Sequence, residues 1–308
     1  MLVLFGGLAA ASLATQDPPT KSLRHFKLDG ASVPSGSYDD KIVFLGTGVA
    51  TIRSVENLSI VRHVKASALS EIGTVVNTNP PTLVTVNKNG LRLWSLPDLT
   101  PLSTVAISGL ENRLELDREL KIIFLHRRNR AIMAYRVAAG KLELAATLKV
   151  ADLQSFRWAP LHKKLLIVRS AHHGVWLWDG FGPIALSPLK VRERLEDALE
   201  LNANKIAGIY ENHEMGILGP TLTPSLEYAR PGNRKGEHLI VRTCKGGLVL
   251  ANRGVIYFFD GATNECEPIW EPSTGDILGF SILPNGEELI VSEAPRSLAL
   301  ASRVRVAQ

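Results

Sequence analysis

The sequence of 308 residues predicts an all-β protein. Short runs rich in Val, Ile and Leu alternate along the chain with turns that contain Gly, Asn, Pro and Asp, which is the pattern of strands joined by tight turns. Helical periodicity is scarce by comparison. The best helical stretch is KVRERLEDALELN at residues 190–202, for which we expect a short helix with Leu195, Ala198 and Leu199 on one face.

A regular repeat narrows the all-β class to a β-propeller. Seven segments each contain a strand, a polar turn and a second strand, and the second strands are spaced by 42, 40, 44, 40, 40 and 42 residues. A period of roughly 40 to 45 residues with several strands per unit is that of a propeller blade. Two packed sandwiches would also give many short strands, but sandwiches rarely keep so constant a spacing. The second strands are expected to begin at Val49, Leu91, Ala131, Val175, Met215, Val255 and Ser297.

We therefore expect a seven-bladed β-propeller, WD-repeat-like but with irregular repeats of about 41 residues. Trp178-Asp179 is the single Trp-Asp pair of the chain, and no blade carries a Gly-His partner. The repeats occupy residues 24–308 as one domain, preceded by residues 1–23. This leading segment is either an N-terminal extension or a signal segment cleaved near Ala14, and the absence of Lys or Arg before Lys21 favours the extension.

Within each blade the strands are assigned from their hydrophobicity. The first run of each pair, such as KIVFLG (41–46), is apolar on both faces, as expected for a strand between two neighbouring blades. An inner strand precedes the pair, as in DLQSFRWAP (152–160). In the last blade, Pro284-Asn285-Gly286 would join the inner strand DILGFSI to the second strand, and SLALAS would be the third strand. More polar outer strands are expected at SIVRHV (59–64), PLSTVAI (101–107) and RVRVAQ (303–308).

The usual catalytic and metal-binding motifs are absent from the sequence. There is no G-x-S-x-G elbow and no phosphate-binding G-x-x-x-x-G-K-[ST] loop, and Gly46-Thr47-Gly48 is expected to be a blade turn. His172-His173 is expected in a turn, without enough partners for a metal site. Cys244 and Cys266 form neither a disulfide framework nor a zinc pattern. We therefore expect a non-enzyme that holds no cofactor and no metal, with Trp94, Trp158, Trp176, Trp178 and Trp270 in the core between blades.

Charge is distributed unevenly along the chain. Residues 121–170 contain eleven Lys or Arg and two acidic residues, a net charge of +9, whereas residues 255–293 contain eight acidic residues and no Lys or Arg. In a seven-bladed ring these segments would lie on opposite sides, so a basic edge would face acidic proteins or anionic lipid headgroups. The alternative is a solvated charge distribution without a partner. The candidate partner-binding residues are Arg127, Arg128, Arg130, Lys163 and Lys164.

The chain resembles the citron-homology (CNH) propeller of subunits in the HOPS and CORVET endolysosomal tethering complexes. The resemblance rests on DDKIVFLGTGVATIRSV, TLVTVNKNGLRLWSLPDLTPLSTV, KIIFLHRRNRAIMAYRVAAGKLEL, SFRWAPLHKKLLIVRSAHHGVWLWDG and GGLVLANRGVIYFFDG, and it covers most of residues 24–304. It implies a non-catalytic platform that contacts a small GTPase or membrane partners. Those subunits continue into a helical solenoid, whereas this chain ends at the last expected strand.

The leading hypothesis is a non-catalytic protein-interaction scaffold, a tethering or vesicle-traffic subunit with a small GTPase, other complex subunits or an anionic membrane surface as partners. Nucleic acid is not expected, because aromatic residues do not interleave with the basic ones. A cytoplasmic location, peripheral on endolysosomal membranes, follows from this hypothesis. The alternatives are a structural subunit of a large complex and a secreted or periplasmic propeller that hydrolyses or binds a ligand.

Overall fold

The fold is seen in a computed structural model of the chain. No helix occurs in the part of the chain that it describes, and no helix long and apolar enough to cross a membrane is found there. The structure describes residues 26–27, 32–70, 72–87, 89–128, 131–170, 172–180, 194–210, 215–218, 224–229, 240–252, 255–263, 265–271, 276–283, 285–294 and 300–306.

The described residues form seven antiparallel sheets. The first sheet contains β2 (Val33–Tyr38), β3 (Lys41–Gly46), β4 (Val49–Ser54) and β5 (Ile60–Lys65). The second contains β6 (Ile72–Val76), β7 (Thr82–Asn87), β8 (Gly90–Ser95) and β9 (Pro101–Ala106). The third contains β10 (Leu110–Asp117), β11 (Ile122–Arg127), β12 (Ala131–Ala138) and β13 (Lys141–Lys149).

The remaining four sheets continue the same order. The fourth contains β14 (Leu153–Ala159), β15 (Lys164–Arg169) and β16 (His172–Trp178). The fifth contains β17 (Leu195–Asn202), β18 (Lys205–Tyr210), β19 (Met215–Leu218) and β20 (Pro224–Ala229). The sixth contains β21 (Ile240–Cys244), β22 (Gly247–Asn252), β23 (Val255–Asp260) and β24 (Cys266–Trp270). The seventh contains β25 (Asp276–Ile282), β26 (Glu288–Ala294), β27 (Leu300–Arg305) and β1 (Phe26–Lys27).

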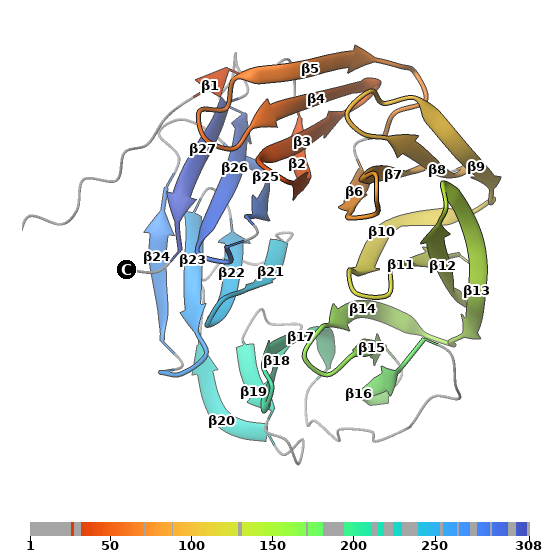
Figure 1. The fold of residues 1–308 in the computed structure, drawn as a ribbon. Coiled ribbons are helices and arrows are strands. Elements are labelled where there is room, and N and C mark those ends of the chain that lie inside the picture. The colour runs from red at the N-terminus through yellow and green to blue at the C-terminus, as the bar shows by residue number, and fades with distance from the viewer. Residues whose placement is uncertain are drawn as a thin grey trace, which may run out of the picture.

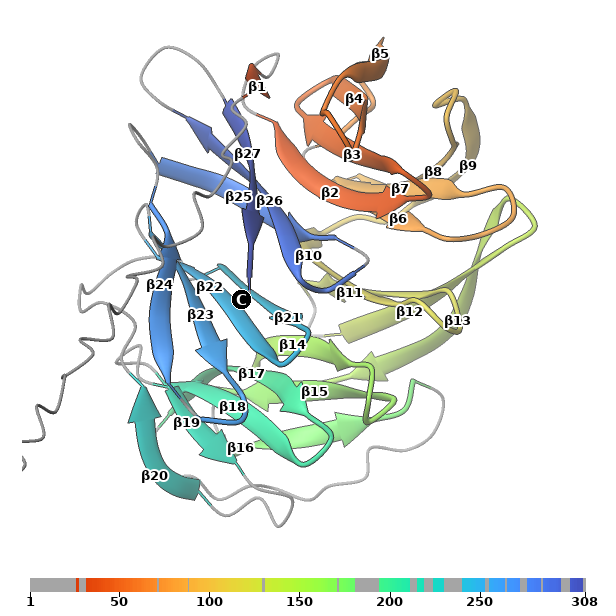
Figure 2. The same ribbon diagram turned by 60° about the vertical axis from the view of Figure 1, so that its left-hand side comes forward.

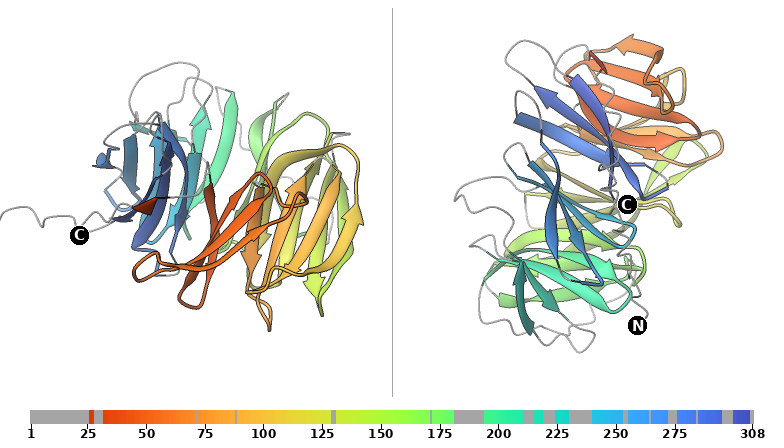
Figure 3. Two further views of the ribbon diagram at one scale, coloured as in Figure 1. Left: turned by 90° about the horizontal axis from the view of Figure 1, so that it is seen from above. Right: turned by 90° about the vertical axis from the view of Figure 1, so that its left-hand side faces the viewer.

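The sheets are arranged about a common centre, with the first strand of each sheet nearest the middle (Figure 1). Turned views show consecutive sheets packed face to face (Figures 2 and 3). The basic segment 121–170 spans β11–β15 and the acidic segment 255–293 spans β23–β26. These strands lie on opposite sides of the arrangement, as the charge pattern predicted (Figure 1).

The core consists of apolar layers between neighbouring sheets. Successive side chains of a strand point to opposite faces, so each second strand contributes to two layers. On β3, Val43 and Leu45 pack against the second sheet, whereas Ile42 and Phe44 pack against Leu283 and Ile290 of the last sheet. This two-sided burial is the reason for the uniformly apolar second strands predicted from the sequence.

The last sheet corrects one strand assignment. RVRVAQ was predicted to be its outer strand, but β27 runs without a break from Leu300 to Arg305 and is the third strand. The outer strand is β1, in which Phe26 pairs with Ala301 and Lys27 with Leu300. SLALAS and RVRVAQ have no turn residues between them, so they could not form two antiparallel neighbours. The N-terminal part of the chain supplies the fourth strand instead.

The predicted helix at residues 190–202 is also wrong over its described part. Residues 195–202 are the strand β17, and residues 190–193 lie outside the described residues. A bulge in β17 explains the misleading pattern, because Leu195 pairs with Tyr210 and Asp197 with the next residue, Ile209. An extra residue in a strand changes which side chains share a face. Leu195 and Ala198 therefore lie in one apolar layer although they are three residues apart.

The turn predictions are largely confirmed. Strands begin at Val49, Ala131, Met215 and Val255 as expected, while β8 and β16 begin earlier, at Gly90 and His172, and Ser297 lies outside the described residues. His172-His173 is thus within a strand and not in a turn. Thr47-Gly48 is the turn between β3 and β4, and Asn285-Gly286 lies in the turn before β26, whereas Pro284 is outside the described residues.

Candidate functional site in the central channel

The inner strands surround a channel of about 580 Å³. One wall carries small residues from β2, β6 and β25: Ser35, Gly36, Gly73, Thr74, Gly279 and Ser281. Packing requires the glycine at position 73, since a Cβ there would lie 2.6 Å from the carbonyl oxygen of Val84, whereas a Cβ at Gly279 would lie 2.5 Å from Val33 Cγ1, a side-chain atom. Glycine thus lets these inner strands approach their neighbours.

The opposite wall is charged. Inner strands β10, β14, β17 and β21 and the turn after β10 supply the residues Arg113, Glu115, Arg118, Arg157, Glu200 and Arg242. Each of these strands contributes one or two of the charged residues. One half of the channel is therefore lined by small residues, and the other half is dominated by arginine side chains.

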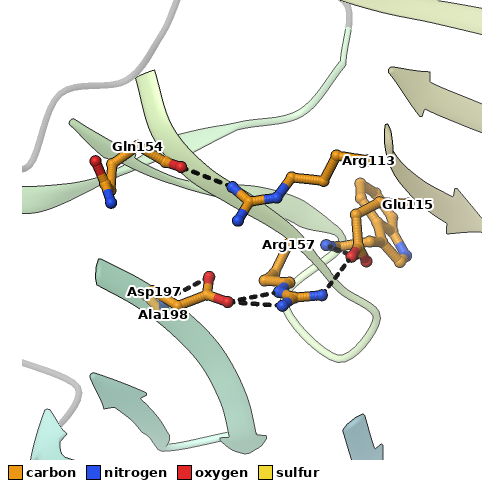
Figure 4. Close-up of polar contacts among 7 residues, drawn as sticks. Arg113, Glu115, Gln154, Arg157, Asp197 and Ala198 are labelled. Atoms are coloured by element: carbon orange, nitrogen blue, oxygen red, sulfur yellow. Dashed lines mark hydrogen bonds and ion pairs between the residues drawn. The ribbon is translucent and has the colours of Figure 1, made fainter. Parts of the chain in front are cut away.

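Arg157 joins three inner strands at the centre of this wall (Figure 4). Its Nε and Nη2 donate to Asp197 Oδ2 at 2.9 and 2.7 Å, and its Nη1 donates to Glu115 Oε1 at 3.0 Å. The other oxygens of these carboxylates accept backbone N–H groups, from Ala198 at 3.0 Å and Trp158 at 3.2 Å. All three charged side chains are at least four-fifths buried, with 16%, 18% and 12% exposure for Arg157, Glu115 and Asp197.

This network stabilises the charged guanidinium. Desolvation alone would lower the pKa of Arg157, but the nearby carboxylates of Asp197 and Glu115 outweigh it and raise that pKa. A buried arginine with two hydrogen-bonded carboxylates satisfies the condition under which buried charges are tolerated. Arg157 is thus committed to holding β10, β14 and β17 together.

Two further arginines lie in the electrostatic field of this network. Arg113 donates from Nη1 to the carbonyl of Gln154 at 2.7 Å (Figure 4). Desolvation lowers the pKa of both Arg113 and Arg242, and the charge of Arg157 acts in the same direction on each. Arg242 is enclosed by the inner strands, yet its side chain is exposed because solvent in the channel reaches it.

Glu200 is held by the turn between β14 and β15. It is 1% exposed, and its carboxylate accepts the backbone N–H groups of Leu161 and His162 at 2.9 and 2.8 Å. The Nδ1 atom of His162 lies 2.5 Å from Glu200 Oε1. This turn is therefore fixed to β17 of the next sheet.

A second feature lies at the end of the ring where β10 and β14 finish. The turns after these two strands are joined by Lys163 and Glu119, whose Nζ and Oε2 are 3.1 Å apart. Leu120 and Leu161 on the same turns are 49% and 63% exposed. We call Glu119, Leu120, Leu161 and Lys163 the turn surface; the turn after β10 is shaped by Asp117, which accepts the N–H groups of Glu119 and Leu120.

The candidate basic residues do not form one cluster. Arg127 pairs with Leu110, at the beginning of β10, and the exposed Arg128 follows it. Lys163 and Lys164 lie beside the residues that follow the end of β10. The two groups are thus near opposite ends of the inner strand β10, and Arg130 lies outside the described residues.

The arginine network was missed in the sequence. A signal was present, because the inner strands LENRLELD, LQSFRWA and LEDALELN carry charged residues at positions that a sheet would bury. The tryptophan prediction is confirmed for Trp94, Trp176, Trp178 and Trp270. Trp158 packs against the same layer as Trp176 and Trp178, stacking on Phe124 with ring centroids 5.3 Å apart, and it also lines the channel.

Metal ligands and disulfides do not contribute to the described site. The part of the chain that the structure describes contains no group of three or more His, Cys, Asp or Glu residues placed to hold a metal ion. Cys244 and Cys266 are half-buried free thiols. Burial raises the pKa of Cys244 to about 12 and that of Cys266 to about 11, so neither is a reactive thiolate at neutral pH.

Comparison with known proteins identifies the fold. No family model and no curated protein matches the sequence. Among solved structures, the "WD40 beta propeller domain of Doa1" is similar with a TM-score of 0.66 and 11% identity, over 91% of this chain and 95% of that one. A chain of the "Mitotic Checkpoint Complex" has a TM-score of 0.66 and 12% identity, over 100% and 98%. At such low identity the likeness shows a WD40-like β-propeller fold and nothing of function.

Proposed function

We propose that the chain is a non-catalytic protein-interaction scaffold, built as a closed ring of seven blades. Closure is supported by the pairing of β1 with β27 and by the apolar layer that the first and last sheets share. A scaffold role is supported by the exposed leucines of the turn surface, which is the observation that carries the proposal. Exposed apolar side chains that lie together and are rimmed by polar residues are a feature of interaction sites.

The chemistry of the turn surface favours an acidic partner with apolar anchors. Leu120 and Leu161 offer apolar contact area, while four basic residues on or beside these turns exceed three acidic ones by one charge: Arg118, Lys121, Lys163 and Lys164 against Asp117, Glu119 and Glu200. Opposite charge on the partner would increase the rate of association and fix the orientation. The resemblance to tethering subunits adds a finer proposal, in which the partner is a small GTPase or another complex subunit and the scaffold acts in the cytoplasm at endolysosomal membranes.

A quantitative binding comparison tests the scaffold proposal. The wild-type chain and a Leu120→Ser/Leu161→Ser variant are used as immobilised baits, and the proteins recovered by each are quantified by mass spectrometry. We expect specific partners to be reduced about tenfold or more, since truncated hot-spot residues cost at least ~1–2 kcal/mol. Ile60→Ser/Leu102→Ser is the matched control, because those side chains are also exposed, at 52% and 45%, but lie on outer strands.

Charge reversal then distinguishes the two ends of the ring. Lys163→Glu should weaken binding of the partners so identified and reduce its dependence on ionic strength. Arg128→Glu changes the charge equally at the opposite end and should leave binding unchanged. Equal recovery by all baits, or a loss confined to Arg128→Glu or to the outer-strand control, would contradict the turn surface as the binding site.

A further inference from the structure

Guanidinium groups are concentrated in one half of the channel lining. Four guanidinium groups, of Arg113, Arg118, Arg157 and Arg242, face three carboxylates, of Glu115, Asp197 and Glu200. Every one of those carboxylate oxygens already accepts a hydrogen bond, from Arg157, His162 or a backbone N–H group. Arg113 is half-buried among the inner strands, whereas solvent in the channel reaches Arg118 and Arg242, so an anion that enters the channel can contact their guanidinium groups.

The space beside these arginines is suited to a small molecule. The channel volume of about 580 Å³ is within the range of ordinary ligand sites. Gly36, Gly73 and Gly279 are among the residues of the facing wall, and Trp158 adds an aromatic surface. Apart from Arg118, the charged groups are on inner strands, which favours a molecule that enters the channel over a macromolecular surface.

We propose that the central channel binds a small phosphorylated molecule, whose phosphate is held by Arg113 and Arg242 beside the Arg157 network. Guanidinium groups match the geometry of phosphate oxygens and form paired hydrogen bonds with them. A phosphate group carries about −1.5 to −2 charges at neutral pH, so it can interact with more than one guanidinium at a time. Arg157 itself is occupied by Glu115 and Asp197 and keeps the site in shape. This proposal does not depend on the scaffold role.

Calorimetric titration with pyrophosphate tests the proposal. At low ionic strength the wild-type chain should bind pyrophosphate, and its melting temperature should rise with pyrophosphate concentration, because a ligand of the native state stabilises it. Arg242→Gln should weaken binding about tenfold or more, and Arg62→Gln should not, since Arg62 is exposed on the outer strand β5. No saturable binding to the wild type, or an equal loss with Arg62→Gln, would overturn the proposal.

Two further arms keep the result interpretable. Arg113→Gln could disturb folding through its contact with Gln154, so Arg113→Lys is tested beside it. Lys keeps the charge but not the paired donors, so Arg113→Lys should bind more weakly than the wild type and more tightly than a folded Arg113→Gln. Sulfate at the same ionic strength should bind more weakly, and equal binding would indicate unspecific anion attraction and overturn the proposal. Vesicles of phosphatidylcholine with phosphatidylinositol phosphate separate a lipid headgroup from a free ligand: binding to vesicles without binding of pyrophosphate would overturn it.

Discussion

At the scale of single residues, the channel depends on the bonding of Arg157. The side chain is largely buried. Each carboxylate oxygen of its two partners, Asp197 and Glu115, accepts a hydrogen bond from Arg157 or from a backbone N–H group. The desolvation cost of such a group is high, and it is offset only while the partners are in place. Arg157 therefore stabilises the fold while its partners are present, and its removal would leave two buried carboxylates without a cation.

Replacing Arg157 with Leu is expected to destabilise the protein by about 3 kcal/mol or more, because Asp197 and Glu115 would remain buried without their cation. Urea denaturation followed by circular dichroism measures the loss. Arg62→Leu on exposed β5 is the control and should change the free energy of unfolding by less than about 0.5 kcal/mol. A loss for Arg157→Leu no larger than for Arg62→Leu would show that the network contributes nothing to stability.

At the scale of the element, the inner strands are specialised by glycines and a bulge. Gly73 brings β6 close to the first sheet, whereas the bulge of β17 places Asp197 where Arg157 reaches it. Neither device changes the number of strands. Both decide which side chains face the channel, and a bulge next to a functional site is a known use of this irregularity.

Gly73→Ala should destabilise the fold by about 2–3 kcal/mol, because the new Cβ would lie 2.6 Å from the carbonyl oxygen of Val84, which is backbone and cannot move aside. Gly246→Ala is the comparison, since its Cβ would meet nothing within 4 Å and only its φ of +83° is unfavourable. That variant should lose only about 1–2 kcal/mol. Thermal and urea unfolding of both variants measure the difference, and a larger loss for Gly246→Ala would contradict the close-packing argument.

At the scale of the whole molecule, the sheets share one core and divide the charge. Apolar layers connect each sheet to the next, so unfolding one sheet would expose the faces of its neighbours. The molecule is electrostatically polarised, because the strands β11–β15 are basic and the strands β23–β26 on the opposite side are acidic. Such a polarised molecule orients a charged partner before contact.

Stability of the whole fold should decrease as the pH rises above about 8.5, where thiols of the unfolded chain ionise. The thiols of the folded state keep their protons until about pH 11 for Cys266 and about pH 12 for Cys244. From about pH 8.5 up to those values the unfolded state therefore binds fewer protons than the folded state. The free energy of unfolding then falls by up to roughly 1.4 kcal/mol per pH unit and thiol, and the contribution is fully present below pH 8.

Urea denaturation between pH 7.5 and 10.5 checks this dependence against a Cys244→Ala/Cys266→Ala variant. The variant retains every other titrating group, so its curve should fall less steeply with pH than that of the wild type. Parallel curves for the two proteins would mean that the thiols are not protected by burial. Slow alkylation of the folded wild type at pH 8, compared with the urea-unfolded chain, should accompany the steeper curve.

The sequence by itself determined the strand repeat, the turns and the two-sided burial of the second strands, because hydrophobic periodicity and turn chemistry act over a few residues. Its blade spacing and its charge segments are recovered in the seven sheets and their opposite sides. The WD40-like propeller fold follows from that local information. The helix predicted near Leu195 failed where a bulge altered the period, which a single-strand pattern cannot reveal.

Only the tertiary structure decided which distant residues meet. Arg157 bonds Glu115 and Asp197, which lie 42 and 40 residues away from it in the sequence. Arg242, on a fourth inner strand, is close enough for the charge of Arg157 to affect its pKa. The arrangement of the sheets also separates Arg127 from Lys163, and the N-terminal strand β1 pairs with β27 as the outer strand of the last sheet. These outcomes depend on strand register and on packing between sheets, and both are long-range contacts that local periodicity does not encode.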